Sequence, residues 1–162
     1  MDDKRQVFIS YSRKDAKWLK ELKIFLSPLE READLQVWSD ADIKPSSDWR
    51  ADIQKAINQA DAAILLISQY FLASDYIAND ELPQLLSAAS ERGLRIFPLI
   101  VSSYYLQESP LLRFQAVNDP SAPLDTLSKA KQHAVLAKFA RNLDELLKVV
   151  RAGITEEWLE KF

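Results

Sequence analysis

Several polar and aromatic side chains that could bind a charged ligand follow short apolar runs of the chain. Tyr11 and Arg13 follow the run Val7-Phe8-Ile9 within four residues, and Tyr70 follows the continuous apolar run 62–67. Glu81 closes the next polar stretch. An arginine forms charge-assisted hydrogen bonds to anions, and a carboxylate stabilises a nearby developing cation. These residue types indicate electrostatic chemistry on a charged ligand.

Other common chemistries lack the residues they require. The chain has 162 residues and no cysteine, which excludes a thiol nucleophile and a thiolate-bound zinc. His133 is the single histidine, so no multi-histidine metal site can form, and we expect no metal. Gly93 and Gly153 are the two glycines, too few for a GxGxxG or Walker loop. A formal net charge of −3 predicts no electrostatic surface for nucleic acid or an anionic membrane.

Short apolar runs alternate with amphipathic stretches, a pattern typical of βαβ units and a parallel sheet. It predicts an α/β fold, a flavodoxin-like doubly wound parallel sheet of order 2-1-3-4-5 flanked by helices. Pro83 predicts an interruption of its helix near Asn79. The expected strands span 6–10, 35–38, 62–67 and 95–101, with at most a short edge strand at 114–117.

We expect residues 1–150 to form one domain and residues 151–162 to be a helical tail or a linker to another domain. The first apolar run has three residues and follows the charged start MDDKRQ. A secretory signal needs roughly 7–15 apolar residues and a membrane-spanning helix about 20. The sequence therefore predicts a cytoplasmic chain without a membrane segment.

Ligands of doubly wound sheets bind beyond the carboxyl ends of the strands, where the strand order reverses. In the predicted order, this crevice lies between the first and third strands. The loop 39–48 lines the same rim. The topology therefore places one set of side chains near the crevice: Tyr11, Arg13, Tyr70, Ser74 and Glu81.

Three segments carry a resemblance to a known family. The sequences VFISYSRKD, WSDADIKPSSDW and SDYIANDELP, in this order, resemble a bacterial TIR (Toll/interleukin-1 receptor homology) domain of the NAD-cleaving branch over residues 7–150. The resemblance implies a flavodoxin-like sheet, a loop after the second strand that takes part in assembly, and either scaffold signalling or cleavage of NAD+. In the enzymatic branch a glutamate after the third strand is catalytic, and by motif position it corresponds to Glu81, with Ser74 as the upstream serine.

The resemblance also implies roles for other residues, with NAD+ as substrate and no separate cofactor. Two departures from the family pattern stand out: Ser46 replaces a common glycine, and Ile77 occupies a position that is aromatic in several NAD-cleaving relatives, with Tyr76 one place away. The expected substrate-binding residues are Ser10, Tyr11, Arg13, Ser74, Tyr76 and Ile77. The expected loop and assembly residues are Trp38, Asp40, Asp42, Ile43, Pro45 and Trp49.

By the same resemblance, the partners would be other TIR domains, as a homo-oligomer or filament, and a fused or separate sensor domain. The role would be an NAD+ glycohydrolase or cyclase in bacterial anti-phage immune signalling, activated by self-assembly. The alternative is a non-catalytic TIR scaffold that mediates contacts between TIR domains. For Glu81 itself, the alternative is a surface carboxylate that stabilises a helix N-terminus. A phosphoacceptor receiver domain is excluded because Ser10 and Ser68 replace its acidic residues. Nucleoside deoxyribosyl transfer fits the chemistry of a glutamate but not the motifs.

Overall fold

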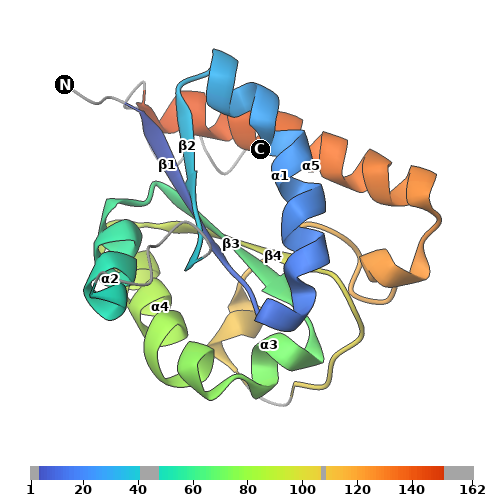
Figure 1. The fold of residues 1–162 in the computed structure, drawn as a ribbon, viewed down its shortest axis with the longest axis horizontal. Coiled ribbons are helices and arrows are strands. Elements are labelled where there is room, and N and C mark those ends of the chain that lie inside the picture. Colours follow the sequence, from blue (N-terminus) through green and yellow to red (C-terminus); the bar gives the residue numbers. More distant parts are fainter. Residues whose placement is uncertain (1–3, 41–47, 107–108, 152–162) are drawn as a thin grey trace.

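A computed structural model of the chain describes residues 4–40, 48–106 and 109–151. Its sheet has four parallel strands in the order β2-β1-β3-β4. Figure 1 shows β1 and β3 side by side, both running toward the lower right of the molecule. This arrangement confirms the predicted flavodoxin-like α/β fold. The strands are β1 (Arg5–Ser10), β2 (Leu35–Trp38), β3 (Ala62–Ile67) and β4 (Arg95–Ile100).

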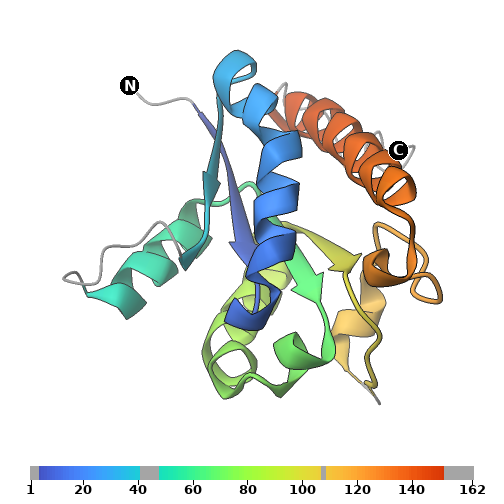
Figure 2. The same ribbon diagram turned by 45° about the vertical axis from the view of Figure 1, so that its right-hand side comes forward.

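Helices cover both faces of the sheet. Side chains of β3 alternate between the two faces, with Ile64 and Leu66 in one core cluster and Ala63 and Leu65 in the other. All six residues of β3 are buried, as expected for a parallel strand covered on both faces. The first cluster is closed by α1 (Ala16–Glu32) and α5 (Lys129–Arg151), which lie side by side in Figure 2. The second is closed by α2 (Trp49–Gln59), α3 (Gln69–Ala73) and α4 (Leu82–Arg92).

The expected edge strand at 114–117 is absent from the described residues, and Pro98 explains why. On the outer edge of β4, the Pro98 carbonyl accepts a hydrogen bond from the Val117 N–H at 2.7 Å, but proline has no N–H to return. At Ile100 the Asn118 side chain replaces a strand, because its amide oxygen accepts from the Ile100 N–H and its NH2 donates to the Ile100 carbonyl. The fifth position of the predicted order 2-1-3-4-5 is therefore occupied by irregular chain.

Pro83 shapes the helix that carries Glu81. Its missing N–H cannot bond the Asn79 carbonyl, and the helix instead widens into a π turn, η3 (Ile77–Glu81), in which the Leu82 N–H donates to the Ile77 carbonyl. This is the interruption predicted near Asn79. The helix continues as α4 and ends at Gly93, whose positive φ of 74° is suited to glycine.

Three 3₁₀ turns complete the described elements: η1 (Arg13–Asp15), η4 (Pro110–Arg113) and η5 (Leu124–Thr126). None of the helices in the described ranges has the length and apolar character needed to cross a bilayer. The predicted tail or linker at 151–162 lies outside the described residues apart from Arg151, the last residue of α5.

Candidate functional site

A buried carboxylate lies at the carboxyl end of β1. Glu81, at the end of the π turn, is 4% exposed, and its Oε1 accepts a hydrogen bond of 2.8 Å from the Ser10 hydroxyl. Ser10 is the last residue of β1 and pairs with Leu65 in the middle of the sheet. The sheet register and the π turn thus bring together two predicted site residues that are far apart in the sequence. They meet at the carboxyl ends of β1 and β3, where the strand order reverses.

Burial raises the pKa of Glu81 to about 7. The hydrogen bond from Ser10 lowers this pKa, while the negative charges of Asp40 and Asp80 raise it and a hydrogen bond from the Tyr76 hydroxyl lowers it. A surface carboxylate at a helix end would have neither this burial nor this shift. The interpretation of Glu81 as a surface residue is therefore wrong. A buried carboxyl group whose pKa is raised to about 7 is typical of functional sites.

Tyr76, whose hydroxyl forms a hydrogen bond with Glu81, packs against a second aromatic ring. The ring centroids of Trp49 and Tyr76 are 4.5 Å apart, with an angle of 38° between the ring planes. Trp49 is the first residue of α2, and Asp48 caps that helix. Burial, followed by the charge of Glu81, raises the pKa of Tyr76, so its hydroxyl keeps its proton at neutral pH. The pair offers an aromatic surface for a planar ligand next to Glu81.

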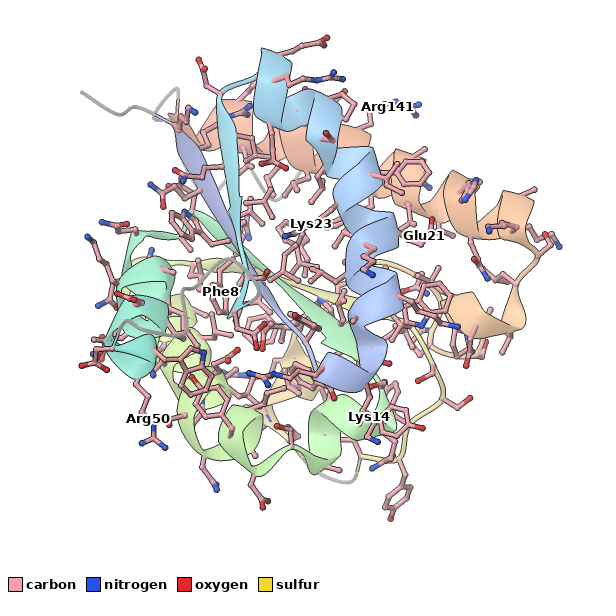
Figure 3. The ribbon with its side chains drawn as sticks, in the orientation of Figure 1. Phe8, Lys14, Glu21, Lys23, Arg50 and Arg141 are labelled. Carbon is pink, nitrogen blue, oxygen red and sulfur yellow. The ribbon has the colours of Figure 1, made fainter. Side chains whose placement is uncertain are left out.

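Charged side chains form ion pairs near the carboxyl ends of the strands. Arg13, which is 82% exposed at its side chain, forms an ion pair of 3.9 Å with Asp40. Arg50 of α2 pairs with Asp80 of the π turn at 3.8 Å, and both remain partly exposed. Figure 3 shows Arg50 and Lys14 at the end of the molecule where β1 and β3 end. The rim therefore has cations within reach of a ligand phosphate.

The remaining loop residues are divided between the core and the part of the chain that is not described. Trp38, at the end of β2, is half-buried and packs against the α2-side core cluster. Asp40 is half-buried beside it in the chain. Asp42, Ile43 and Pro45 lie outside the described residues, as does Ser46.

Three predicted substrate-binding residues have structural contacts of their own. The Tyr11 ring is 9% exposed and belongs to the core cluster on the α1 side of the sheet. Ile77 is 3% exposed and packs in the other cluster. Ser74 begins the Glu81 helix: its hydroxyl accepts from the Ile77 N–H at 3.3 Å, and its carbonyl accepts from Ala78. Of the three, Ser74 positions Glu81 by capping its helix.

The structure adds a pair of residues that the sequence did not single out as a unit. The Ser68 hydroxyl, fully buried after β3, donates a hydrogen bond to the carboxylate of Asp15 and accepts from the Phe71 N–H at 3.1 Å. Asp15 is 4% exposed, and burial raises its pKa. In the sequence, Ser12 and Asp15 have the spacing of a local helix cap, and such a local pattern carries no signal that Asp15 is buried. The pair ties the segment after β1 to the segment after β3.

Among the described residues, no three His, Cys, Asp or Glu side chains are placed to hold a metal ion. The groups that the site does offer are one buried carboxyl, two neighbouring aromatic rings and cations on the rim. This combination suits a ligand that carries a planar cationic ring and phosphate groups.

Comparison with known proteins agrees with the fold. The TIR domain from the Toll-related receptor TRR-2 of Hydra magnipapillata superposes with a TM-score of 0.52 at 20% identity, covering 88% of this chain and 97% of that domain. The TIR domains of the activated Roq1 resistosome, which directly recognises the pathogen effector XopQ, give a TM-score of 0.51 at 20% identity, covering 91% of this chain and 78% of that one.

A protein of Sinorhizobium fredii (strain NBRC 101917 / NGR234), the uncharacterized protein y4lF, is 29% identical over 118 residues. The match covers 73% of this chain but 36% of that protein, so the chain spans about a third of the length of this relative. The family model described as TIR domain matches residues 7–146, most of the chain. The chain therefore belongs to the TIR domain family.

Proposed function

We propose that this TIR domain hydrolyses NAD+ and releases nicotinamide. The observation that carries the proposal is Glu81, a carboxyl group that is 4% exposed and whose pKa burial raises to about 7. Burying a group that must ionise lowers the stability of the fold at neutral pH, and such arrangements cluster at functional sites. A domain that only binds other TIR domains gains nothing from this carboxyl group.

The reaction needs little beyond one carboxylate. The bond between the ribose C1′ and the nicotinamide nitrogen breaks, and its electron pair leaves with nicotinamide, which becomes neutral without a proton. The ribose carbon develops oxocarbenium character, as in glycoside hydrolysis, and the Glu81 carboxylate stabilises this charge. Water then attacks C1′ and loses a proton, giving ADP-ribose. In this scheme the Ser10 hydroxyl, 2.8 Å from Oε1, favours the ionised form of Glu81 and holds its position.

Neighbouring groups account for substrate binding in this proposal. The Trp49–Tyr76 pair provides a ring surface for nicotinamide, and the exposed Arg13 provides charge-assisted hydrogen bonds to the pyrophosphate. Since Glu81 is 4% exposed, ribose reaches it only when a covering group moves. Tyr76 is the candidate, because its hydrogen bond to Glu81 can be exchanged for one from a ribose hydroxyl.

The direct test is incubation of the full chain with NAD+ and chromatographic detection of free nicotinamide. Release that exceeds the rate without protein supports the proposal. A folded chain that releases no nicotinamide at any concentration or pH indicates the alternative, a TIR scaffold without catalysis.

The pH dependence of nicotinamide release follows from the ionisation of Glu81. Because the carboxylate is the active form, kcat/KM is expected to rise with pH through about 7 and then reach a plateau. Ser10→Ala removes the hydrogen bond that lowers the Glu81 pKa, so the midpoint should move to higher pH. Ser12→Ala is a matched control, since Ser12 caps η1 and not Glu81. A rate that is flat from pH 5.5 to 8.5 contradicts the assignment.

We further propose that activity depends on assembly, with the loop of one TIR domain completing the crevice of its neighbour in a homo-oligomer or filament. Specific activity should then rise with protein concentration or on addition of a sensor-domain partner. Activation by assembly would suit an effector in bacterial immune signalling against phage. Replacing Ile43 or Pro45 with a charged residue should lower activity without lowering the melting temperature. The measurements are initial rates over a wide concentration range and light scattering. A monomer with constant specific activity contradicts this model.

A further inference from the structure

A cavity lies on the outer edge of β4, where the fifth strand was expected. The cavity, of about 710 Å³, opens between the first half of β4, the segment 113–119 and α5. None of its lining residues belongs to the Glu81 site. Its volume is within the range of roughly 300–1,000 Å³ that is typical of small-molecule sites.

The edge of β4 does not suit an added strand. The residues whose backbone faces outward are Ile96, Pro98 and Ile100, alternating along the strand. Pro98 has no N–H and its carbonyl is bonded to Val117, while both backbone groups of Ile100 are bonded to Asn118. An incoming strand could pair only with Ile96. A small molecule is therefore the better occupant than a peptide or a strand of a second copy.

The cavity combines aromatic rings with an arginine that has no anionic partner in the part of the chain that the structure describes. Phe97 of β4 and Phe139 of α5 meet edge to face, with centroids 5.6 Å apart, so their faces are not stacked on each other. Arg95 stands two residues before Phe97 and is half-buried. Within the described ranges, no carboxylate or carbonyl is bonded to its guanidinium. A half-buried arginine without an anion is a ready binding group for a ligand anion.

The charges around the cavity favour an anion. Lys138 on α5 and Arg113 add two further cations, against the acids Asp119 and Glu145. The Asp119 carboxylate already accepts hydrogen bonds from the Ser121 N–H and hydroxyl, at 2.9 and 2.7 Å. We propose that this cavity binds a small planar aromatic molecule that carries an anionic group, of the mononucleotide class. The ring packs against Phe97 and Phe139, and the anion pairs with Arg95 and Lys138.

The test is a titration of the ¹⁵N-labelled full chain with AMP, followed by NMR. Amide shifts are expected at Phe97, Asn118 and Phe139. Arg95→Gln and Lys138→Glu should each weaken AMP binding about tenfold or more, and adenosine, which lacks the phosphate, should bind at least tenfold more weakly than AMP. Lys131→Glu makes the same charge change on α5 outside the cavity, and AMP affinity should not change.

Lys138 is exposed, so we expect Lys138→Glu to leave the fold intact. If Arg95→Gln does not fold, the AMP affinity of Lys138→Glu still tests the proposal. Three outcomes would overturn the proposal: no shifts at millimolar AMP, shifts confined to the Ser10 and Tyr76 region, or an affinity that Lys138→Glu leaves unchanged. Equal affinities for AMP and adenosine would contradict the proposal that Arg95 and Lys138 bind the anionic group of the ligand. None of these measurements depends on NAD+ cleavage, so the proposed function can fail while this site stands.

Discussion

Glu81→Gln is expected to reduce nicotinamide release by at least about 100-fold while the protein remains folded. The amide keeps the shape of the side chain but cannot carry the negative charge that stabilises the oxocarbenium-like transition state. Removing one preorganised electrostatic group from an active site typically lowers the rate by about 10²–10³-fold. The measurement is single-turnover nicotinamide release at pH 8, where wild-type Glu81 is ionised.

The matched control is the neighbouring carboxylate. Asp80→Asn removes a charge from the same π turn, but Asp80 is ion-paired with Arg50 and more exposed. Its activity should remain within a few fold of wild type, with the pH midpoint moved slightly lower, because Asp80 raises the Glu81 pKa. Near-normal turnover by a folded Glu81→Gln protein would show that the carboxylate is not the catalytic group.

The same Glu81→Gln variant should also be more stable than wild type at high pH. Glu81 has a folded pKa of about 7 against 4.5 in the unfolded chain, so the folded state binds the proton more tightly. In the wild type, protonated Glu81 contributes fully to the free energy of unfolding below pH 4.5, and this contribution is lost as the pH rises through about 7. At pH 8 the variant avoids this loss, on the order of 1–3 kcal/mol. Melting temperatures should therefore differ at pH 8 and coincide near pH 4.

Leu66→Ala is expected to lower the free energy of unfolding by about 2–5 kcal/mol. Leu66 lies in the central strand β3, is fully buried, and packs in the cluster closed by α1 and α5. Truncating it removes apolar contacts and leaves a cavity that close-packed neighbours cannot refill. The measurement is urea unfolding followed by circular dichroism.

The control for Leu66 is Ile24→Ala on α1. Ile24 is 63% exposed, and its truncation should change stability by less than about 0.5 kcal/mol. A loss below about 1 kcal/mol for Leu66→Ala would mean that β3 is not the centre of the sheet. Both variants should retain the pH midpoint of nicotinamide release, because neither residue touches Glu81.

Local patterns in the sequence were sufficient to predict the framework. The continuous apolar run 62–67 predicted a central strand, and the alternation of strands with amphipathic stretches predicted the parallel order of β2, β1, β3 and β4. Pro83 predicted a break near Asn79 because a missing N–H acts within a single turn. Burial periodicity and the backbone effects of proline depend on near neighbours in the chain, so they can be recognised without a structure.

The edge of the sheet was harder to predict. The run 114–117 has the composition of a short strand, yet it forms none, because the strand it would pair with contains Pro98 and because Asn118 takes the hydrogen bonds of Ile100. A strand depends on its partner as much as on its own residues. The pairing partner is decided by tertiary structure.

The sequence alone excluded several kinds of chemistry. The absence of cysteine, the single histidine and the two glycines left a carboxylate, aromatic rings and cations as the groups available to a site. The burial of this carboxylate and its pKa depend on the tertiary structure. Glu81 is an ordinary acid by composition. The π turn places it against the end of β1, where burial raises its pKa to about 7 although the hydrogen bond from Ser10 lowers that pKa. Solvation and electrostatic interactions depend on which groups are close in space, and residues 10 and 81 come close only when the chain folds.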